Sequence, residues 1–331
     1  MNRKKNKKWS IVILITLFII PSLYFAGIYF FYKRPRQALW FKLIFNNTEN
    51  YSKSIKNNKI IFSGGSNTLF GIRTQLIEQI FRVPSVNLGV TAALKIDYII
   101  HVTKRNVQKG DVVILPLEYI HYHYSNQKYS ATRSEYIRTY DVPFFRSQSI
   151  VHQIRDIKKT SPLDLLRSIN EQLEFKKKKQ KIIKNVGKIV KNNFNKNGDA
   201  INNNKPAKKI LEHRFKAADD PGNFKETDGL KLLKDFNNWC KKNKIHFYIT
   251  YPNLLYNEKY RNKRFRRYFK SLNHYFQINK IAVIGSPYDF MYERKLFWDT
   301  KYHLTYDGVT MRTMQFIELM KKHKIPELIK K

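Results

Sequence analysis

The sequence predicts an α/β protein in which helices cover both faces of a five-stranded, mostly parallel sheet and form a three-layer sandwich. Three features of its 331 residues support this fold class. Short apolar runs alternate with helical patterns, an uncharged run near the N-terminus is long enough to cross a membrane, and a long basic interval interrupts the alternation.

The first element is a predicted transmembrane helix at residues 11–32. This run has no charged side chain, and a helix of its length spans a hydrocarbon core of ~30 Å. More Lys and Arg precede the run than follow it, so we expect the N-terminus in the cytoplasm. Residues 1–36 would then be a cytoplasmic tail and anchor, with the single-pass chain continuing outside the cytoplasm. A cleaved signal peptide is the competing interpretation.

The five strands are expected at short apolar runs that end in turn residues. These runs are Lys59–Ser63, Ser85–Gly89, Asp111–Leu117, Ile245–Tyr251 and Ile281–Gly285. In parallel sheets ligands bind beyond the carboxyl ends of the strands. Several polar or turn residues fall just past these ends: Ser66, Gly89, Glu118 and Pro252.

The interval at about 119–228 is predicted to be a helical cap inserted into a domain that spans 37–331. Its stretch 176–209 holds twelve Lys and one acidic residue, so it cannot bury much apolar surface. We expect a solvated helix there, followed by a mobile loop.

Composition limits the partners and the chemistry. Lys and Arg number 63 against 25 Asp and Glu, and the net charge of +38 favours a polyanionic surrounding. Nucleic acid, an anionic membrane and an acidic cell-surface polymer all satisfy this, but an extracytoplasmic domain excludes nucleic acid. With Cys240 as the single cysteine, intrachain disulfides and Cys-rich metal sites are excluded. No cofactor or metal is expected.

The first candidate site is the turn Ser63–Gly71, with the sequence SGGSNTLFG. Its paired glycines permit a sharp turn that places Ser66 at the start of a helix, facing backbone N–H groups. The commonest role of such a serine is to cap the helix. A phosphate-binding loop is a weaker alternative, because the terminal Gly-Lys-Ser/Thr of that motif is missing.

The second candidate site lies near the C-terminus. Asp299 and His303 are four residues apart, so on a helical turn the carboxylate could orient the imidazole. Most lone Asp/His pairs are structural. This pair, however, follows the last strand, from which a base could reach a nucleophile on the first.

Two aromatic segments are further candidates for binding. The loop 118–124 contains two histidines and Glu118, which could bind a metal, but its many tyrosines favour sugar stacking or packing. The segment 260–270 mixes cations with aromatic residues; it is either a solvated amphipathic face or a surface for a polyanion or lipid headgroups.

These blocks resemble the SGNH/GDSL hydrolase family, and more closely its membrane-anchored branch associated with cell-surface polymer acyl transfer. The matches are Gly64-Gly65-Ser66-Asn67, Asn87-Leu88-Gly89 and Asp299 to His303, and they cover about residues 59–118 and 229–325. The resemblance implies that Ser66 attacks an acyl carbonyl, His303 is the base and Asp299 orients it. It also implies that the N–H groups of Ser66 and Gly89 form an oxyanion hole.

The chain departs from the family pattern at two points. Glu118 and Tyr119 stand where the family has Gly-x-Asn-Asp, whose asparagine donates to the oxyanion. Asn67 or a loop tyrosine such as Tyr119 is the candidate substitute, with Glu118 at the substrate edge. The Asp-to-His spacing is also one residue longer than the family's.

Taken with the resemblance, the sequence predicts an extracytoplasmic, membrane-anchored serine acyl-transfer enzyme, either an O-acetyltransferase or an esterase. Its expected substrate is a cell-envelope polysaccharide or related polymer. The alternative is a catalytically silent SGNH-like scaffold that binds an anionic polymer or a multi-spanning membrane acyltransferase. The retained Ser66, Asp299 and His303 favour the enzyme, and the missing asparagine favours the scaffold.

Overall fold

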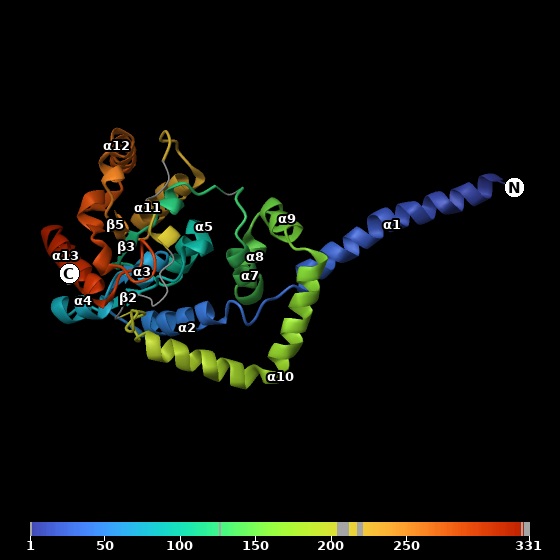
Figure 1. Cartoon of the computed structure of the whole chain (residues 1–331), viewed down its shortest axis with the longest axis horizontal. Helices are drawn as coiled ribbons and strands as arrows, with labels where there is room; N and C mark the ends of the chain where they lie inside the picture. Colours follow the sequence, from blue (N-terminus) through green and yellow to red (C-terminus); the bar gives the residue numbers. More distant parts are fainter. Residues whose placement is uncertain (1, 126, 204–211, 217–220, 326, 328–331) are drawn as a thin grey trace. The chain divides into compact units, whose positions relative to one another are not determined.

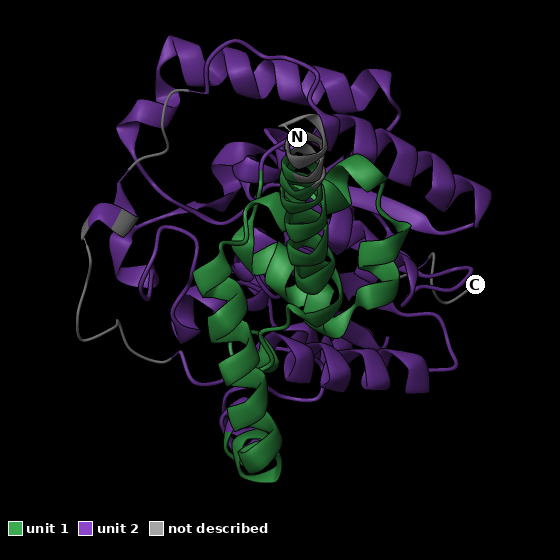
Figure 2. Ribbon diagram, turned by 90° about the vertical axis from the view of Figure 1, so that its right-hand side faces the viewer, with its two compact units in different colours: residues 1–39, 129–185 green, residues 40–128, 186–331 purple. Residues whose placement is uncertain are grey.

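The computed structural model describes residues 2–125, 127–203, 212–216, 221–325 and 327. The chain divides into two compact units, shown in Figure 2. Unit 1 comprises residues 1–39 and 129–185, and unit 2 comprises residues 40–128 and 186–331. The interval predicted as an inserted cap therefore contributes to both units.

Unit 2 contains the sheet, in the strand order β2-β1-β3-β4-β6 with every pairing parallel. The strands are β1 (Ile60–Phe62), β2 (Ser85–Asn87), β3 (Val112–Pro116), β4 (His246–Thr250) and β6 (Ala282–Ile284). All five predicted strands are confirmed. A second, two-stranded sheet of β5 (Leu254–Leu255) and β7 (Met291–Tyr292) was not predicted.

Helices connect these strands (Figure 1). The α-helices of unit 2 are α2 (Leu39–Ser54, entering from unit 1), α3 (Ser66–Leu69), α4 (Thr74–Phe81), α5 (Lys95–Lys104), α6 (Tyr119–Tyr122), α11 (Asp228–Lys242), α12 (Lys263–Ile278) and α13 (Tyr306–Lys322). Its 3-10 turns are η1 (Ala92–Leu94), η2 (Glu212–Phe215), η3 (Glu258–Arg261), η4 (Pro287–Phe290) and η5 (Arg294–Leu296).

Aromatic contacts show that the sheet is covered on both faces. Phe62 of β1 contacts Phe316 of α13, and Phe247 of β4 contacts Phe236 of α11. Through the strand register, Phe62 shares a face with Tyr248, and its neighbour Phe247 points to the other face. Helices α13 and α11 thus lie on opposite faces, consistent with the predicted three-layer sandwich.

The basic stretch is more ordered than expected in its described part. Helix α10 (Pro162–Asn193) contains a kink at Lys178 and is followed by a turn in which Asp199 is fully buried. The Asp199 carboxylate accepts hydrogen bonds from the Thr74 N–H (2.9 Å), the Thr74 hydroxyl (2.8 Å) and the Gln75 N–H (2.8 Å). The prediction of a mobile loop is therefore wrong for residues 194–203, because Asp199 in this segment caps α4. Residues 204–209 lie outside the described residues.

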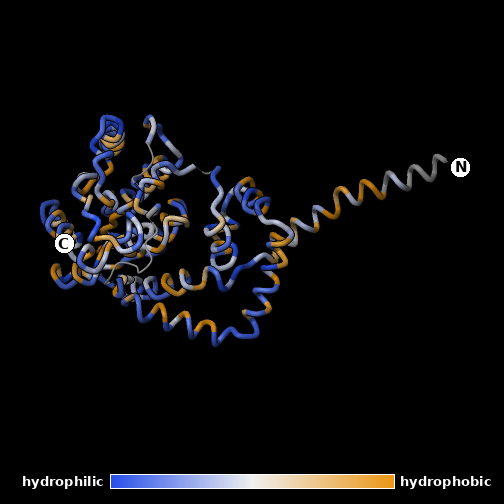
Figure 3. Tube along the Cα trace, viewed as in Figure 1, coloured by the Kyte–Doolittle hydropathy of each residue, from blue (hydrophilic) through white to orange (hydrophobic). Residues whose placement is uncertain are grey.

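Unit 1 is helical and begins with α1 (Asn2–Phe31). Residues Val12–Phe31 are long and apolar enough to cross a membrane, with a mean hydropathy of 2.2, although a signal sequence can share these properties. Figure 3 shows this apolar stretch along α1. The other helices of unit 1 are α7 (Ala131–Tyr140), α8 (Val142–Ser147), α9 (Ile150–Lys158) and the first part of α10.

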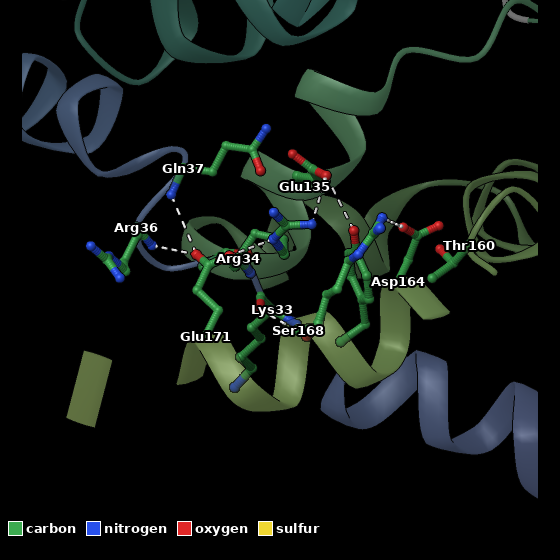
Figure 4. A network of polar contacts seen from close by, with 12 residues as sticks. Lys33, Arg34, Arg36, Gln37, Glu135, Thr160, Asp164, Ser168 and Glu171 are labelled. Atoms are coloured by element: carbon green, nitrogen blue, oxygen red, sulfur yellow. Dashed lines mark hydrogen bonds and ion pairs between the residues drawn. The ribbon is translucent and has the colours of Figure 1, made fainter. Parts of the chain in front are cut away.

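Hydrogen bonds hold the segment that leaves α1 (Figure 4). The Lys33 N–H donates to the Ser168 hydroxyl, which in turn donates to the Lys33 carbonyl, both at 2.9 Å. The Glu171 carboxylate accepts from the Arg36 N–H at 2.7 Å and pairs with the Arg34 guanidinium. These contacts tie the exit from α1 to α10 within unit 1.

We predict that Asp199→Ala destabilises unit 2 by about 1–2 kcal/mol, because it leaves the first N–H groups of α4 without their acceptor. The measurement is the free energy of unfolding in urea. Asp235→Ala, which changes an exposed aspartate of α11, is the control and should have little effect. Equal effects of the two substitutions would contradict the capping role.

Candidate active site

The turn after β1 leaves the Ser66 hydroxyl unengaged. A side chain at Gly64 would collide with the Thr68 hydroxyl, and one at Gly65 would collide with the Glu118 carboxylate, so only glycine fits these positions. Gly65 is the N-cap of α3. Ser66, the first residue of that helix, is partly exposed, and its hydroxyl forms no hydrogen bond with any residue that the structure describes. The helix-capping alternative for Ser66 is therefore wrong.

Glu118 is a buried carboxylate that anchors this turn. One of its oxygens accepts the Asn67 N–H at 3.0 Å, and the other lies 3.2 Å from Nε2 of buried His121. Burial raises the pKa of Glu118, but the imidazole and the N–H outweigh that effect and hold the pKa below its ordinary value. An ionised carboxylate only accepts hydrogen bonds, so Glu118 cannot donate to an oxyanion.

Two of the expected oxyanion donors are engaged inside the fold. The Asn67 side chain is fully buried and donates to the Pro116 carbonyl at 2.9 Å. The Gly89 N–H donates to the Asn87 side-chain oxygen at 2.9 Å. Both groups therefore have an acceptor inside the fold, and oxyanion roles for Asn67 and Gly89 stay predictions. The Ser66 N–H remains as a donor that could face an oxyanion, since the first N–H of a helix has no intrahelical acceptor.

Asp299 and His303 lie together in a tight loop rather than on the expected helical turn. A bridge between Phe297 and Leu304 closes this loop, and the Trp298 N–H donates to the His303 carbonyl at 2.8 Å. Nδ1 of His303 is 2.7 Å from Oδ1 of Asp299. The carboxylate can therefore set the orientation of the ring and leave Nε2 as the reactive nitrogen.

The loop docks against the far end of the helix that begins with Ser66. The Leu304 N–H donates to the Phe70 carbonyl at 3.2 Å, and the rings of Phe70 and His303 are 4.8 Å apart. Within the described residues no hydrogen bond joins the Ser66 hydroxyl to His303.

A pocket of about 680 Å³ opens beside Ser66. It is lined mainly by aromatic rings, with Lys128 and Lys301 as cations. The other lining residues are Ala92, Glu118, Tyr119, Ile120, His123, Pro221, Tyr260, Phe265, Tyr268, Phe269 and Tyr302. Asp299 and His303 are not among them, although Lys301 and Tyr302 of the same loop are. The pocket can accept a ring-shaped substrate with negative charge.

The residues of the two aromatic segments have distinct roles. The Tyr119 hydroxyl is buried at the pocket with no hydrogen-bond partner among the described residues. His123 stacks on Tyr268 of α12 at 5.3 Å, and burial beside Lys128 lowers its pKa. Within the part of the chain that the structure describes, no three His, Cys, Asp or Glu side chains gather to hold a metal.

Sequence reasoning missed Arg312, which supports the serine turn from α13. This fully buried guanidinium donates to the carbonyls of Asn67 (3.2 Å) and Tyr251 (3.3 Å) and pairs with Asn253. Burial lowers its pKa to about 10. An Arg at helical spacing between Val309 and Phe316, both apolar, is the signal that could have revealed it.

No protein-family model and no curated protein matches the chain. One similar solved structure is that of a Streptococcus pneumonia protein with a provisional assignment as a platelet activating factor. Its TM-score is 0.34 and its sequence identity 9%, over 83% of this chain and 91% of the other.

We predict that Glu118→Gln lowers the free energy of unfolding by about 1–3 kcal/mol at pH 7, because it removes a buried charge-assisted contact. The folded-state pKa of Glu118 lies below its unfolded value, so its contribution is complete above the unfolded value and is lost as the pH falls through the folded one. The difference between native chain and variant should shrink on acidification below pH ~4.

The control for this prediction is Glu318→Gln, which alters an exposed ion pair with Lys321 and should have little effect at any pH. Urea unfolding curves between neutral and acidic pH measure both variants. A stability difference for Glu118→Gln that grows on acidification would contradict the assignment of an ionised anchor.

Proposed function

We propose that the chain is a membrane-anchored serine acyl-transfer enzyme of SGNH type, either an O-acetyltransferase or an esterase. The observation that carries the proposal is a partly exposed Ser66 hydroxyl, unbonded within the described residues, on a helix that the Asp299–His303 loop contacts. A nucleophile, a base and a group that orients the base are the parts that acyl transfer requires.

In the proposed mechanism, Oγ of Ser66 attacks the acyl carbonyl while Nε2 of His303 accepts the serine proton. Asp299 holds Nδ1 and stabilises the imidazolium that forms. The tetrahedral intermediate collapses, His303 returns the proton to the departing alcohol, and an acyl-serine remains. Water or a sugar hydroxyl then attacks this ester, and His303 again takes the proton and passes it to Ser66.

The pocket supports a cell-envelope polysaccharide as the substrate class. Tyrosine and phenylalanine rings stack on the apolar faces of sugars, and Lys128 and Lys301 would attract an acidic group. The net charge of +38 over the whole chain would also attract a polyanionic polymer through long-range electrostatics.

Packing within unit 1 supports a retained anchor rather than a cleaved leader. Ile28 and Tyr32, at the end of α1 and just after it, are buried against Ile157 of α9. Arg138 of α7 donates to the Ile28 carbonyl at 2.6 Å. Cleavage after α1 would remove part of this core, so we propose a single-pass protein with its C-terminal part outside the cytoplasm.

The second candidate function is a catalytically silent scaffold that binds an anionic polymer or a multi-spanning membrane acyltransferase. It is favoured by the ionised Glu118 beside the serine turn and by the engaged Asn67 and Gly89 donors. Loss of a single oxyanion donor costs ~10²–10³ in rate, so a site with only the Ser66 N–H would be slow.

The test is covalent labelling of the purified full-length chain by a fluorophosphonate, together with hydrolysis of 4-nitrophenyl acetate. Ser66→Ala should abolish labelling and lower the hydrolysis rate by ~10³-fold or more. Its melting temperature should stay nearly unchanged, because the Ser66 hydroxyl forms no hydrogen bond with the described residues.

Ser271→Ala is the matched control, because Ser271 is also partly buried and lines a different pocket of unit 2. This variant should keep both labelling and hydrolysis. A native chain that takes no label would favour the scaffold, and a Ser66→Ala variant with native activity would exclude the serine mechanism.

A further inference from the structure

The helices that follow the anchor in unit 1 expose apolar side chains along defined faces. On α9 these are Ile150, Val151 and Ile154, which are 72%, 67% and 55% exposed. Positions i, i+1 and i+4 of a helix lie on one side. Ile157, one turn further along the same face, is buried in the core against Ile28 and Tyr32, so the exposed residues extend this apolar face beyond the core.

Helix α10 carries a second exposed apolar face. Leu163, Leu166, Ile169 and Leu173 repeat at intervals of three and four and thus form one stripe along the first three turns. The stripe ends at Lys176, where a run of four consecutive lysines begins. In a water-soluble helix such a stripe would face the protein core, and here it faces outward.

The α10 stripe is continuous with the surface of the membrane-crossing helix. A groove of about 480 Å³ in unit 1 is lined by Gly27 and Phe31 of α1 and by Leu165, Ile169 and Leu173 of α10. Phe30 and Phe31, at the end of α1, are themselves well exposed. Lipid that surrounds the end of α1 would therefore also meet the first turns of α10.

We propose that α9 and the first half of α10 lie in the headgroup and upper acyl region of the same bilayer that α1 crosses. The apolar faces of both helices contact the acyl chains, and the basic residues around them contact anionic headgroups. This inference rests on the membrane-anchored part of the proposed function.

Charge and direction both fit this placement. Residues 129–185 contain thirteen Lys and Arg against six Asp and Glu. Basic side chains flank the two apolar faces, and those of Lys158, Lys159, Arg167 and Lys176 are exposed. In Figure 1 the first half of α10 runs across the end of α1 rather than along it. With α1 upright in the bilayer, this part of α10 lies along the membrane surface.

The test uses single-cysteine variants of the full-length chain in nanodiscs of phosphatidylcholine and phosphatidylglycerol. Each variant carries a polarity-sensitive fluorophore, and lipids brominated near the headgroup or deep in the chains act as quenchers. Leu23→Cys reports the anchor, Leu166→Cys reports the α10 stripe, and Glu174→Cys is the matched exposed position on the same helix. Cys240 is buried, so the native chain serves as the labelling blank.

We expect lipids brominated deep in the acyl chains to quench the fluorophore at Leu23→Cys. Lipids brominated near the headgroup should quench the fluorophore at Leu166→Cys about twofold more than the one at Glu174→Cys. An unquenched Leu166→Cys label with a quenched Leu23→Cys label overturns the inference and leaves the anchor standing. If the Leu166→Cys label is shielded from water yet unquenched, a protein surface covers the stripe, which also overturns it. An unquenched Leu23→Cys label refutes the anchor and the inference with it.

Discussion

Two buried charges tie the serine turn to the rest of unit 2, and the candidate site depends on them. Glu118, just past the end of β3, accepts the Asn67 N–H, and Arg312 of α13 donates to the Asn67 carbonyl. An unpaired buried charge is costly, so loss of the contact between the turn and either Glu118 or Arg312 would lower the stability of the fold substantially. One peptide segment is thereby held from both sides, and Ser66 directly precedes it.

The same anchoring limits what the site can do in chemical terms. The residue at the end of β3 supplies a carboxylate that accepts, where an asparagine would supply an amide that donates. Asn87 likewise holds the Gly89 N–H to shape the backbone. The fold therefore uses for rigidity several groups that acyl transfer would use for charge stabilisation. Which of the two proposed functions applies, enzyme or scaffold, depends on how well the Ser66 N–H alone can stabilise an oxyanion.

Unit 1 packs the end of α1 into a helical core. The chain leaving α1 is held by Ser168 and Glu171, and the last turn of α1 is held by Arg138. Because α1 shares a core with α9, its orientation is coupled to that of the surrounding helices.

Local patterns in the sequence determined the strands, the apolar N-terminal helix and the glycine turn. Each depends on a short run of residues: the buried strands on continuous apolar side chains, and the turn on paired glycines at Gly64 and Gly65. Tertiary structure alone decided which groups those elements meet. The partners of Asn67 and Asp199, and the burial of Arg312, arise from contacts between residues far apart in the chain. Hydrogen-bond partners depend on positions in space, and spacing along the chain does not encode them.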